Sequence, residues 1–123
     1  MSDIKFSIHS RIKSFGFATN GLIQFFKTQH NAWIHVVAAV LVVSAGFYFK
    51  VSATEWCLIA GCIGLVFMAE MFNTAIEWLT NIVSPAYNAP AGMVKDIAAA
   101  GVLFSAIVAV VIAAIIFVPK LNL

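Results

Sequence analysis

Three long apolar blocks constrain this chain more than any other feature of its sequence. They cover residues 32–49, 56–81 and 97–118, and short polar segments separate them. A helix of about 20 apolar residues crosses the roughly 30 Å hydrocarbon layer of a bilayer at 1.5 Å per residue. Of the 123 residues, 63% are hydrophobic and 10% charged, whereas a soluble domain carries roughly 25% charged residues. The pattern predicts an all-α integral membrane protein of one domain, 1–123, with three transmembrane helices.

Residues 1–31 show the different pattern of an amphipathic helix. Apolar positions recur at intervals of four and three from Ile8 to Phe26 and share one helical face, while Lys13 and the other basic residues point elsewhere. We expect a surface helix in the headgroup layer, with Asn20-Gly21 as the place for a break or bend. We also expect a polar turn over 50–55, and a loop over 87–92 because its Asn, Pro and Gly favour turns.

Basic residues are distributed unevenly between the two sides of the predicted spans. Five lie on the side of the N-terminal segment and two on the other: Lys5, Arg11, Lys13, Lys27 and Lys95 against Lys50 and Lys120. Cytoplasmic segments carry the excess of Lys and Arg, so we expect a cytoplasmic N-terminus. The net charge of +2 is spread thinly, and no basic run with interleaved aromatic residues indicates nucleic-acid binding. We find no signal peptide in the first thirty residues.

Polar residues on one face of the second span are the main functional signal. Glu70, Asn73 and Glu77 fall within an arc of about 60° on a helix of 3.6 residues per turn. An ionised residue deep in a bilayer costs about 2.5–3.5 kcal/mol or more, so Glu70, well inside the span, indicates a functional site. Glu77 stands beside Trp78, and simple hydration of this carboxylate in the membrane interface remains the alternative.

Lys95 and Asp96 stand at the mouth of the third span, level with the inner end of the second. There Lys95 is placed to neutralise Glu77 or to meet a phosphate, and the alternative is a flanking anchor residue. Carboxylates, an amide and a lysine together suit Mg²⁺ and phosphate chemistry. The chain has no phosphate-binding glycine loop of the soluble kinases. The three histidines, His9, His30 and His35, lack metal-ligand spacing, and we expect a histidine at the membrane edge to be satisfied by a neighbouring residue.

The sequence E-M-F-N-T-A-I-E from Glu70 to Glu77, followed by K-D-I-A-A-A from Lys95, closely resembles the prokaryotic diacylglycerol kinase family. Further segments are similar to the form that this family shares with undecaprenol kinases: Arg11 to Phe15, Asn20-Gly21-Leu22, and Asn31 with Ile34-His35. The resemblance covers nearly the whole chain. It implies a homotrimer in the bacterial cytoplasmic membrane, with a surface helix and three spans per subunit, active sites between neighbouring chains, and use of ATP with Mg²⁺.

The resemblance also implies roles for individual residues. Glu70 would be the base for the lipid hydroxyl, Asn73 would hold the polar network, and Glu77 would bind the metal and through it the nucleotide. Lys95 and Asp96 would handle the nucleotide phosphates and the ribose or metal, and Lys13 would reach a phosphate from the surface helix. The reaction expected first is phosphorylation of diacylglycerol to phosphatidic acid, with undecaprenol as the alternative acceptor.

Two positions depart from the pattern of the family. A Glu that would join Glu77 on the metal is replaced by Gln29, and an Asp four residues after Glu77 is replaced by Asn81. Both changes keep the shape and remove the charge, so a weakly active or inactive homologue remains an alternative. A non-enzymatic membrane protein, such as a small channel that uses the acidic face for cations, is the competing hypothesis from another class.

Overall fold

The chain is almost entirely helical in the computed structural model, which describes residues 5–122. Four α-helices follow one another, α1 over Ile8–Thr28, α2 over His30–Tyr48, α3 over Ala53–Val83 and α4 over Ala89–Phe117, and a short 3-10 turn, η1, covers Val118–Lys120. Three segments are long and apolar enough to cross a membrane, His30–Tyr48, Ala53–Val83 and Ala89–Lys120. The predicted class, an N-terminal helix followed by three apolar spans, is confirmed.

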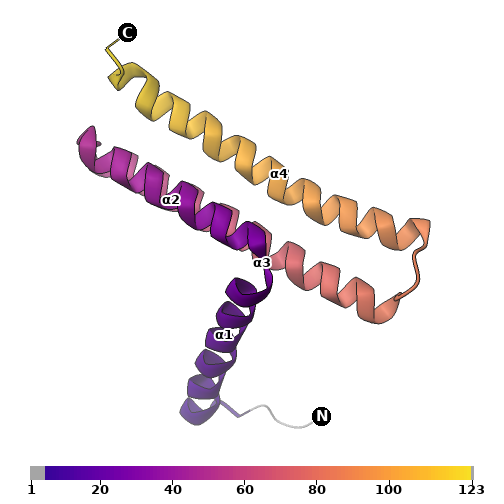
Figure 1. Cartoon of the computed structure of the whole chain (residues 1–123). Helices are drawn as coiled ribbons and strands as arrows, with labels where there is room; N and C mark the ends of the chain where they lie inside the picture. The colour runs from indigo at the N-terminus through magenta and orange to yellow at the C-terminus, as the bar shows by residue number, and fades with distance from the viewer. Residues whose placement is uncertain (1–4, 123) are drawn as a thin grey trace.

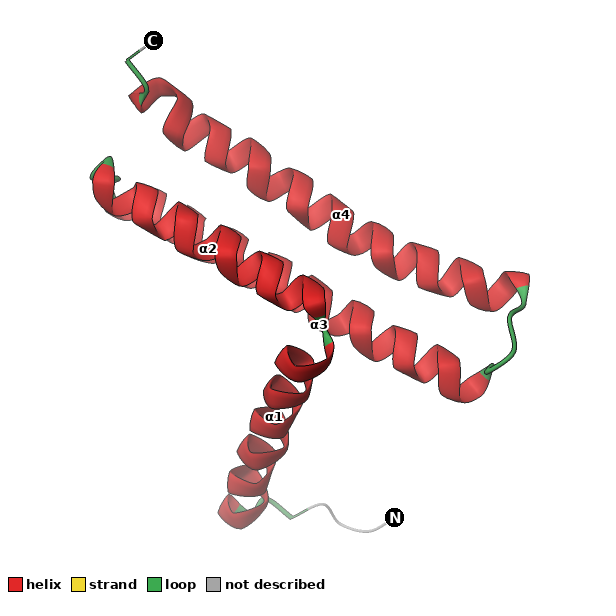
Figure 2. Ribbon diagram, viewed as in Figure 1, coloured by secondary structure: helices red, strands yellow, loops and turns green. Residues whose placement is uncertain are grey.

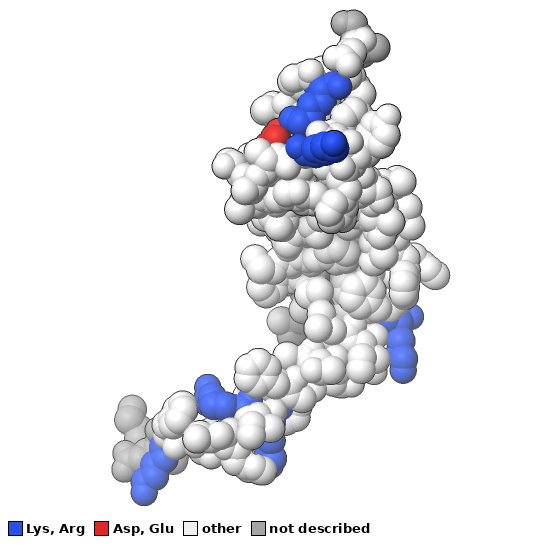
Figure 3. All heavy atoms as spheres, turned by 90° about the vertical axis from the view of Figure 1, so that its left-hand side faces the viewer, with Lys and Arg blue, Asp and Glu red and all other residues white. Residues whose placement is uncertain are grey.

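The three spans run alongside one another and α1 leaves them at a steep angle (Figure 1). The second half of α3 and the first half of α4 continue past the junction of α1 and α2, and the loop that joins them lies at that far end. Helix α1 is continuous through Asn20-Gly21, so the chain does not break there. Charged side chains on the face shown in Figure 3 lie towards its two ends, with a broad uncharged band between them.

The corner between α1 and α2 is fixed by aromatic residues. Gln29 has extended backbone angles and separates the two helices. Trp33 Nε1 donates a hydrogen bond to the carbonyl oxygen of Phe26 at 2.8 Å, and the rings of these residues meet edge to face with centroids 5.6 Å apart. The ring of Phe26 also lies 6.1 Å from that of Phe67 on α3. The corner is therefore placed against the middle of α3.

The opposite end of the spans holds the turn between α2 and α3. Lys50 has a φ of 52°, a left-handed conformation that reverses the chain after a helix. The Ser52 hydroxyl accepts from Glu55 N, and the Glu55 carboxylate accepts from Ser52 N, a reciprocal cap that starts a helix. Glu55 also accepts from Lys120 Nζ at 2.6 Å, which ties the start of α3 to the end of α4.

The structure corrects both predicted connections, because each helix begins earlier than its apolar run. Helix α3 starts at Ala53, inside the expected polar turn. Helix α4 starts at Ala89, inside the expected loop, where the Asn88 side chain accepts from Ala91 N at 2.9 Å. Pro90 lies in the first helical turn, where a missing N–H costs no hydrogen bond. The connections are correspondingly short (Figure 2).

Candidate active site between the spans

Glu70 is a buried acidic side chain at the centre of the site. It lies on α3 with 4% of its surface exposed, although Lys and Glu are almost never buried without a partner. Its partner is His35 on α2, whose Nε2 lies 2.9 Å from Glu70 Oε1. His35 is five residues from the start of α2, so the pair forms next to the α1–α2 corner. The prediction that a neighbour satisfies this histidine is confirmed.

Asn73 and Glu77 continue the polar face of α3 one and two turns further on. Asn73 Nδ2 donates to Glu77 Oε1 at 3.5 Å. Asn73 Oδ1 and the Thr74 hydroxyl are fully buried and have no hydrogen-bond partner among residues 5–122. An unsatisfied buried polar atom costs roughly 1–3 kcal/mol. Each of these two oxygens can therefore still accept a hydrogen bond, which none of the described residues donates.

A groove of about 380 Å³ opens beside Glu70 and Asn73. Its other lining residues come from the start of α2 and the middle of α4: Asn31, Ile34, His35, Ala99, Val102, Leu103 and Ala106. Helix α4 contributes only apolar side chains, and two of its four are alanines. The groove therefore combines a hydrocarbon-like wall with a single carboxylate, which suits an amphiphile whose polar end reaches Glu70.

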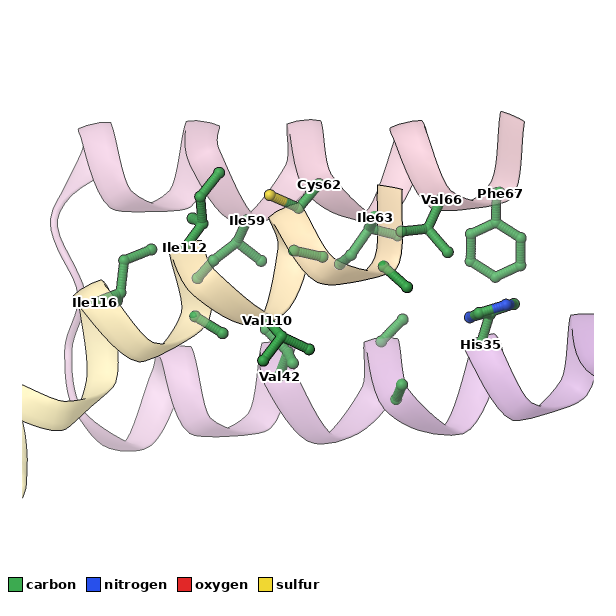
Figure 4. Close-up of a pocket in the computed structure, with 15 residues that line it drawn as sticks. His35, Val42, Ile59, Cys62, Ile63, Val66, Phe67, Val110, Ile112 and Ile116 are labelled. Carbon is green, nitrogen blue, oxygen red and sulfur yellow. The ribbon is translucent and has the colours of Figure 1, made fainter. Parts of the chain in front are cut away.

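A second cavity of about 180 Å³ lies between α2, α3 and α4 and is lined almost entirely by aliphatic side chains. His35 and Phe67 lie at one end of it and Ile116 at the other (Figure 4). His35 and Ala106 line both this cavity and the polar groove. The apolar cavity and the groove at Glu70 are therefore neighbours that share a wall.

Among residues 5–122, Lys95 forms no hydrogen bond or ion pair with Glu77, which was one of the roles that the sequence suggested for it. Its Nζ donates instead to Asn81 Oδ1 at 2.6 Å. This hydrogen bond joins the start of α4 to the end of α3. Asp96, the next residue, is exposed. The two residues lie on the half of the spans that extends past the α1–α2 corner, and neither lines the groove at Glu70.

Lys13 and Gln29 also lie outside the groove. Lys13 is exposed on α1. Gln29 is half-buried at the corner, and its Nε2 donates to Thr28 Oγ1 at 3.2 Å. Among residues 5–122, no three His, Cys, Asp or Glu side chains come together as a metal cluster. A single chain thus unites Glu70 and Asn73 on one groove and links Asn73 to Glu77, but among residues 5–122 no hydrogen bond or ion pair joins Glu77 to the other predicted phosphate and metal groups.

Sequence reasoning missed two members of the site. His35 was expected to have a neighbour, but nothing in the apolar run around it identified Glu70 as that neighbour. Thr74 was read only as part of the family pattern, although its hydroxyl is buried and unpaired. Its position one residue after Asn73, and four after Glu70, was the available signal, because residues four apart share a helical face.

The comparisons with known proteins agree on one family. Residues 16–117 match the family described as prokaryotic diacylglycerol kinase. The chain belongs to this family. It is 36% identical over 109 residues to the undecaprenol kinase of Bacillus subtilis, with 89% of each chain covered. It is 34% identical to the diacylglycerol kinase of Synechocystis, covering 88% of this chain and 62% of that one. Identity to the diacylglycerol kinase of Escherichia coli K12 is 31%, with 81% and 82% covered.

Membership makes this chain a lipid kinase of the prokaryotic diacylglycerol kinase family, and thereby a multi-pass membrane protein that uses ATP. The relatives carry two different names, undecaprenol kinase and diacylglycerol kinase. The buried carboxylate beside an apolar groove is consistent with a site where the hydroxyl of a lipid meets a base.

Proposed function

We propose that this kinase transfers the γ-phosphate of ATP to the hydroxyl of a membrane lipid alcohol, with Glu70 as the catalytic base. The observation that carries the proposal is the groove of about 380 Å³ that opens on Glu70 between α2, α3 and α4. A lipid that enters sideways from the bilayer keeps its tail against the apolar wall of α4 and brings its hydroxyl to the carboxylate. Glu70 is 4% exposed, so little bulk water competes for this position.

The reaction follows from this placement. The lipid oxygen forms a bond to the γ-phosphorus, the bond from that phosphorus to the bridging oxygen breaks, and ADP leaves. The hydroxyl proton passes to Glu70, which suits a carboxylate acting as a general base. Phosphoryl transfer depends mainly on positioning of the reactants and on neutralisation of the phosphate charge. In this proposal Glu70 on α3 positions the acceptor, and charged residues outside the groove neutralise the phosphates.

The carboxylate of Glu77 suits Mg²⁺, which takes oxygen ligands. This carboxylate is half-buried and accepts from Asn73 Nδ2, and Mg²⁺ in such sites takes one or two carboxylates together with substrate phosphates. We assign Glu77 as its carboxylate ligand and the neutral side-chain oxygen of Gln29 as a weaker second ligand. When bound, the ion neutralises phosphate charge. Asn73 orients Glu77 through its amide.

The nucleotide groups come from the charged residues outside the groove. Lys95 and Asp96 lie beyond the corner, where they are placed for phosphate oxygens and for the ribose or metal, and Lys13 on α1 is placed for a further phosphate. Because no Lys or Arg of the described residues 5–122 lines the groove, we infer that a single chain does not complete the site. This supports a homo-oligomer in which neighbouring chains supply the missing groups, and the resemblance to the family favours a trimer.

The proposed acceptor is undecaprenol, and diacylglycerol, which the sequence favoured, is the second candidate. Support for undecaprenol comes from the relative of that name, which is 36% identical over 89% of both chains. Support for diacylglycerol comes from the Synechocystis and E. coli relatives. Both lipids present a hydroxyl at the interface on apolar tails. We place the N-terminus and the ATP-binding end in the cytoplasm of a bacterium, in agreement with the excess of basic residues there.

Purified protein in mixed micelles tests the proposal directly. With radiolabelled ATP and Mg²⁺, we expect label in extracted lipid from undecaprenol and, more slowly, from dioleoylglycerol. Glu70→Gln and Glu77→Gln should each lower the transfer to a trace of the wild-type rate while the oligomer still assembles. Glu55→Gln serves as the matched control, because Glu55 lies on the same helix at the opposite end. Faster labelling of dioleoylglycerol would reverse the order of the acceptors.

Survival of transfer in both variants would reject Glu70 and Glu77 as the working carboxylates. Absence of label from the wild-type protein, together with a cation conductance that Glu70→Gln abolishes, would instead support the non-enzymatic channel.

A further inference from the structure

The pairing of His35 with Glu70 is the one contact of the proposed base that the proposed chemistry leaves without a role. It joins α2 to α3 at 2.9 Å. The side chain of His35 is 21% exposed and that of Glu70 is 6% exposed, so the contact is sheltered from water. A hydrogen bond to a charged group in such surroundings is stronger than one between neutral groups.

The proposed role of Glu70 as a base fixes the direction of the hydrogen bond. A base must be ionised, and an ionised carboxylate only accepts hydrogen bonds, so in this scheme Nε2 of His35 carries the hydrogen and donates it to Oε1 of Glu70. Oε2 of Glu70 has no hydrogen bond to residues 5–122, and it is not among their fully buried unpaired atoms. One oxygen is thus held and the other has no partner among these residues, on a residue that lines the groove.

The His35 ring is itself held in place. Its centroid lies 6.1 Å from that of Phe67 on α3, with the two rings at 70° to each other, an edge-to-face arrangement that aromatic rings favour. Figure 4 shows the two rings facing each other at the end of the apolar cavity. Among residues 5–122, His35 and Glu70 are the only titratable residues that line the groove, and the residues that α4 presents there are all apolar.

We propose that His35 is a positioning residue for the kinase reaction: its Nε2–H holds Oε1 of Glu70 and thereby points Oε2 at the hydroxyl of the acceptor lipid. The inference rests on the proposed function, since it requires Glu70 to be the base. His35 does not exchange a proton with the lipid in this scheme. The hydroxyl proton goes to Oε2, while the His35 hydrogen bond prevents the carboxylate from rotating away.

Two substitutions of His35 separate positioning from simple packing. His35→Leu places an apolar side chain of similar volume against Phe67 and removes the hydrogen-bond donor. His35→Gln keeps an N–H donor on a flexible chain. A misplacement of about 1 Å in a catalytic group costs up to roughly 100-fold in rate. We expect His35→Leu to lower kcat by about 10- to 100-fold with KM for ATP within about two-fold of wild type, and His35→Gln to recover kcat to within about ten-fold.

Two further measurements test whether His35 acts through Glu70. In the Glu70→Gln background, His35→Leu should lower the residual rate by no more than about two-fold, because residues that act as a unit are not additive. In ¹⁵N-histidine-labelled protein, the Nε2–H proton of His35 should resonate downfield and move upfield in Glu70→Leu. His9→Leu is the control, since His9 is exposed on α1, and it should change neither the rate nor this signal.

The outcomes separate this inference from the proposed function. An active Glu70→Gln enzyme would reject Glu70 as the base and with it the proposed function. An inactive Glu70→Gln enzyme combined with an unchanged kcat in His35→Leu would overturn only the role of His35. Equal losses in His35→Leu and His35→Gln would show a packing role and would overturn it as well.

Discussion

Lys95 Nζ donates to Asn81 Oδ1 at 2.6 Å and thereby joins the start of α4 to the end of α3. The acceptor is a neutral amide, so the contact uses one hydrogen of the ammonium group without cancelling its charge. The resemblance to the family leads us to expect an Asp at position 81, which would neutralise this lysine. In this chain the contact therefore leaves the positive charge of Lys95 uncancelled, as its proposed role at the nucleotide phosphates requires.

Asn81→Asp should weaken the binding of ATP. The new carboxylate competes with phosphate for Lys95, and an exposed ion pair contributes about 0–1 kcal/mol, so we expect KM for ATP to rise by up to about five-fold with kcat little changed. Steady-state kinetics at saturating lipid measure this. Asn88→Asp adds the same charge at the nearby helix cap, where Asp is tolerated, and should leave KM unchanged. A lower KM in Asn81→Asp would contradict this use of Lys95.

Trp33→Phe should loosen the corner between α1 and α2. Phe retains the edge-to-face contact with Phe26 but lacks the N–H that donates to the Phe26 carbonyl at 2.8 Å. The loss of such a hydrogen bond costs about 0.5–1.5 kcal/mol, which unfolding by sodium dodecyl sulphate in micelles can measure. Trp78→Phe is the matched control, because Trp78 is 47% exposed and forms no side-chain hydrogen bond to residues 5–122. Equal stability of the two variants would exclude a role for the Trp33 bond.

The sequence predicted the helices well and the contacts between them poorly, for a physical reason. Each span can be recognised from its own apolar run. The angular positions of Glu70, Asn73 and Glu77 around the helix axis follow from the geometry of one helix alone. The contacts of His35 with Glu70 and of Lys95 with Asn81 depend on the rotation and register of one helix against another. The periodicity of residues within one helix carries no information about either.

The early start of α4 was missed from the sequence for a different reason. Pro90 and Gly92 were weighted as turn formers, yet the cap from Asn88 and the tolerance of Pro in a first helical turn allow the helix to begin at Ala89.

Gly46→Ala should destabilise the end of the spans that holds the turn between α2 and α3. A Cβ at Gly46 would lie 2.6 Å from Cη2 of the Trp56 ring, and that ring also packs against the ring of Phe47, at a centroid distance of 4.8 Å. Overpacking of this kind costs about 1–3 kcal/mol, again measured by unfolding in micelles. Gly16→Ala is the control: a Cβ there meets no atom within 4 Å, and Ala favours a helix by up to about 1 kcal/mol. A gain in stability from Gly46→Ala would contradict the close helix contact.

Gln29→Glu should strengthen the response to Mg²⁺. An amide oxygen attracts a divalent cation less than a carboxylate does, and Gln29 is half-buried at the α1–α2 corner, where surrounding protein limits screening by water. We expect the concentration of free Mg²⁺ for half-maximal kinase activity to fall by roughly ten-fold, equivalent to about 1.4 kcal/mol, and Gln29→Ala to raise it. Gln24→Glu is the charge-matched control, since Gln24 is exposed on the same helix. If Gln29→Glu gains nothing over wild type, position 29 does not act on the metal, and the second ligand of the ion must come from another residue.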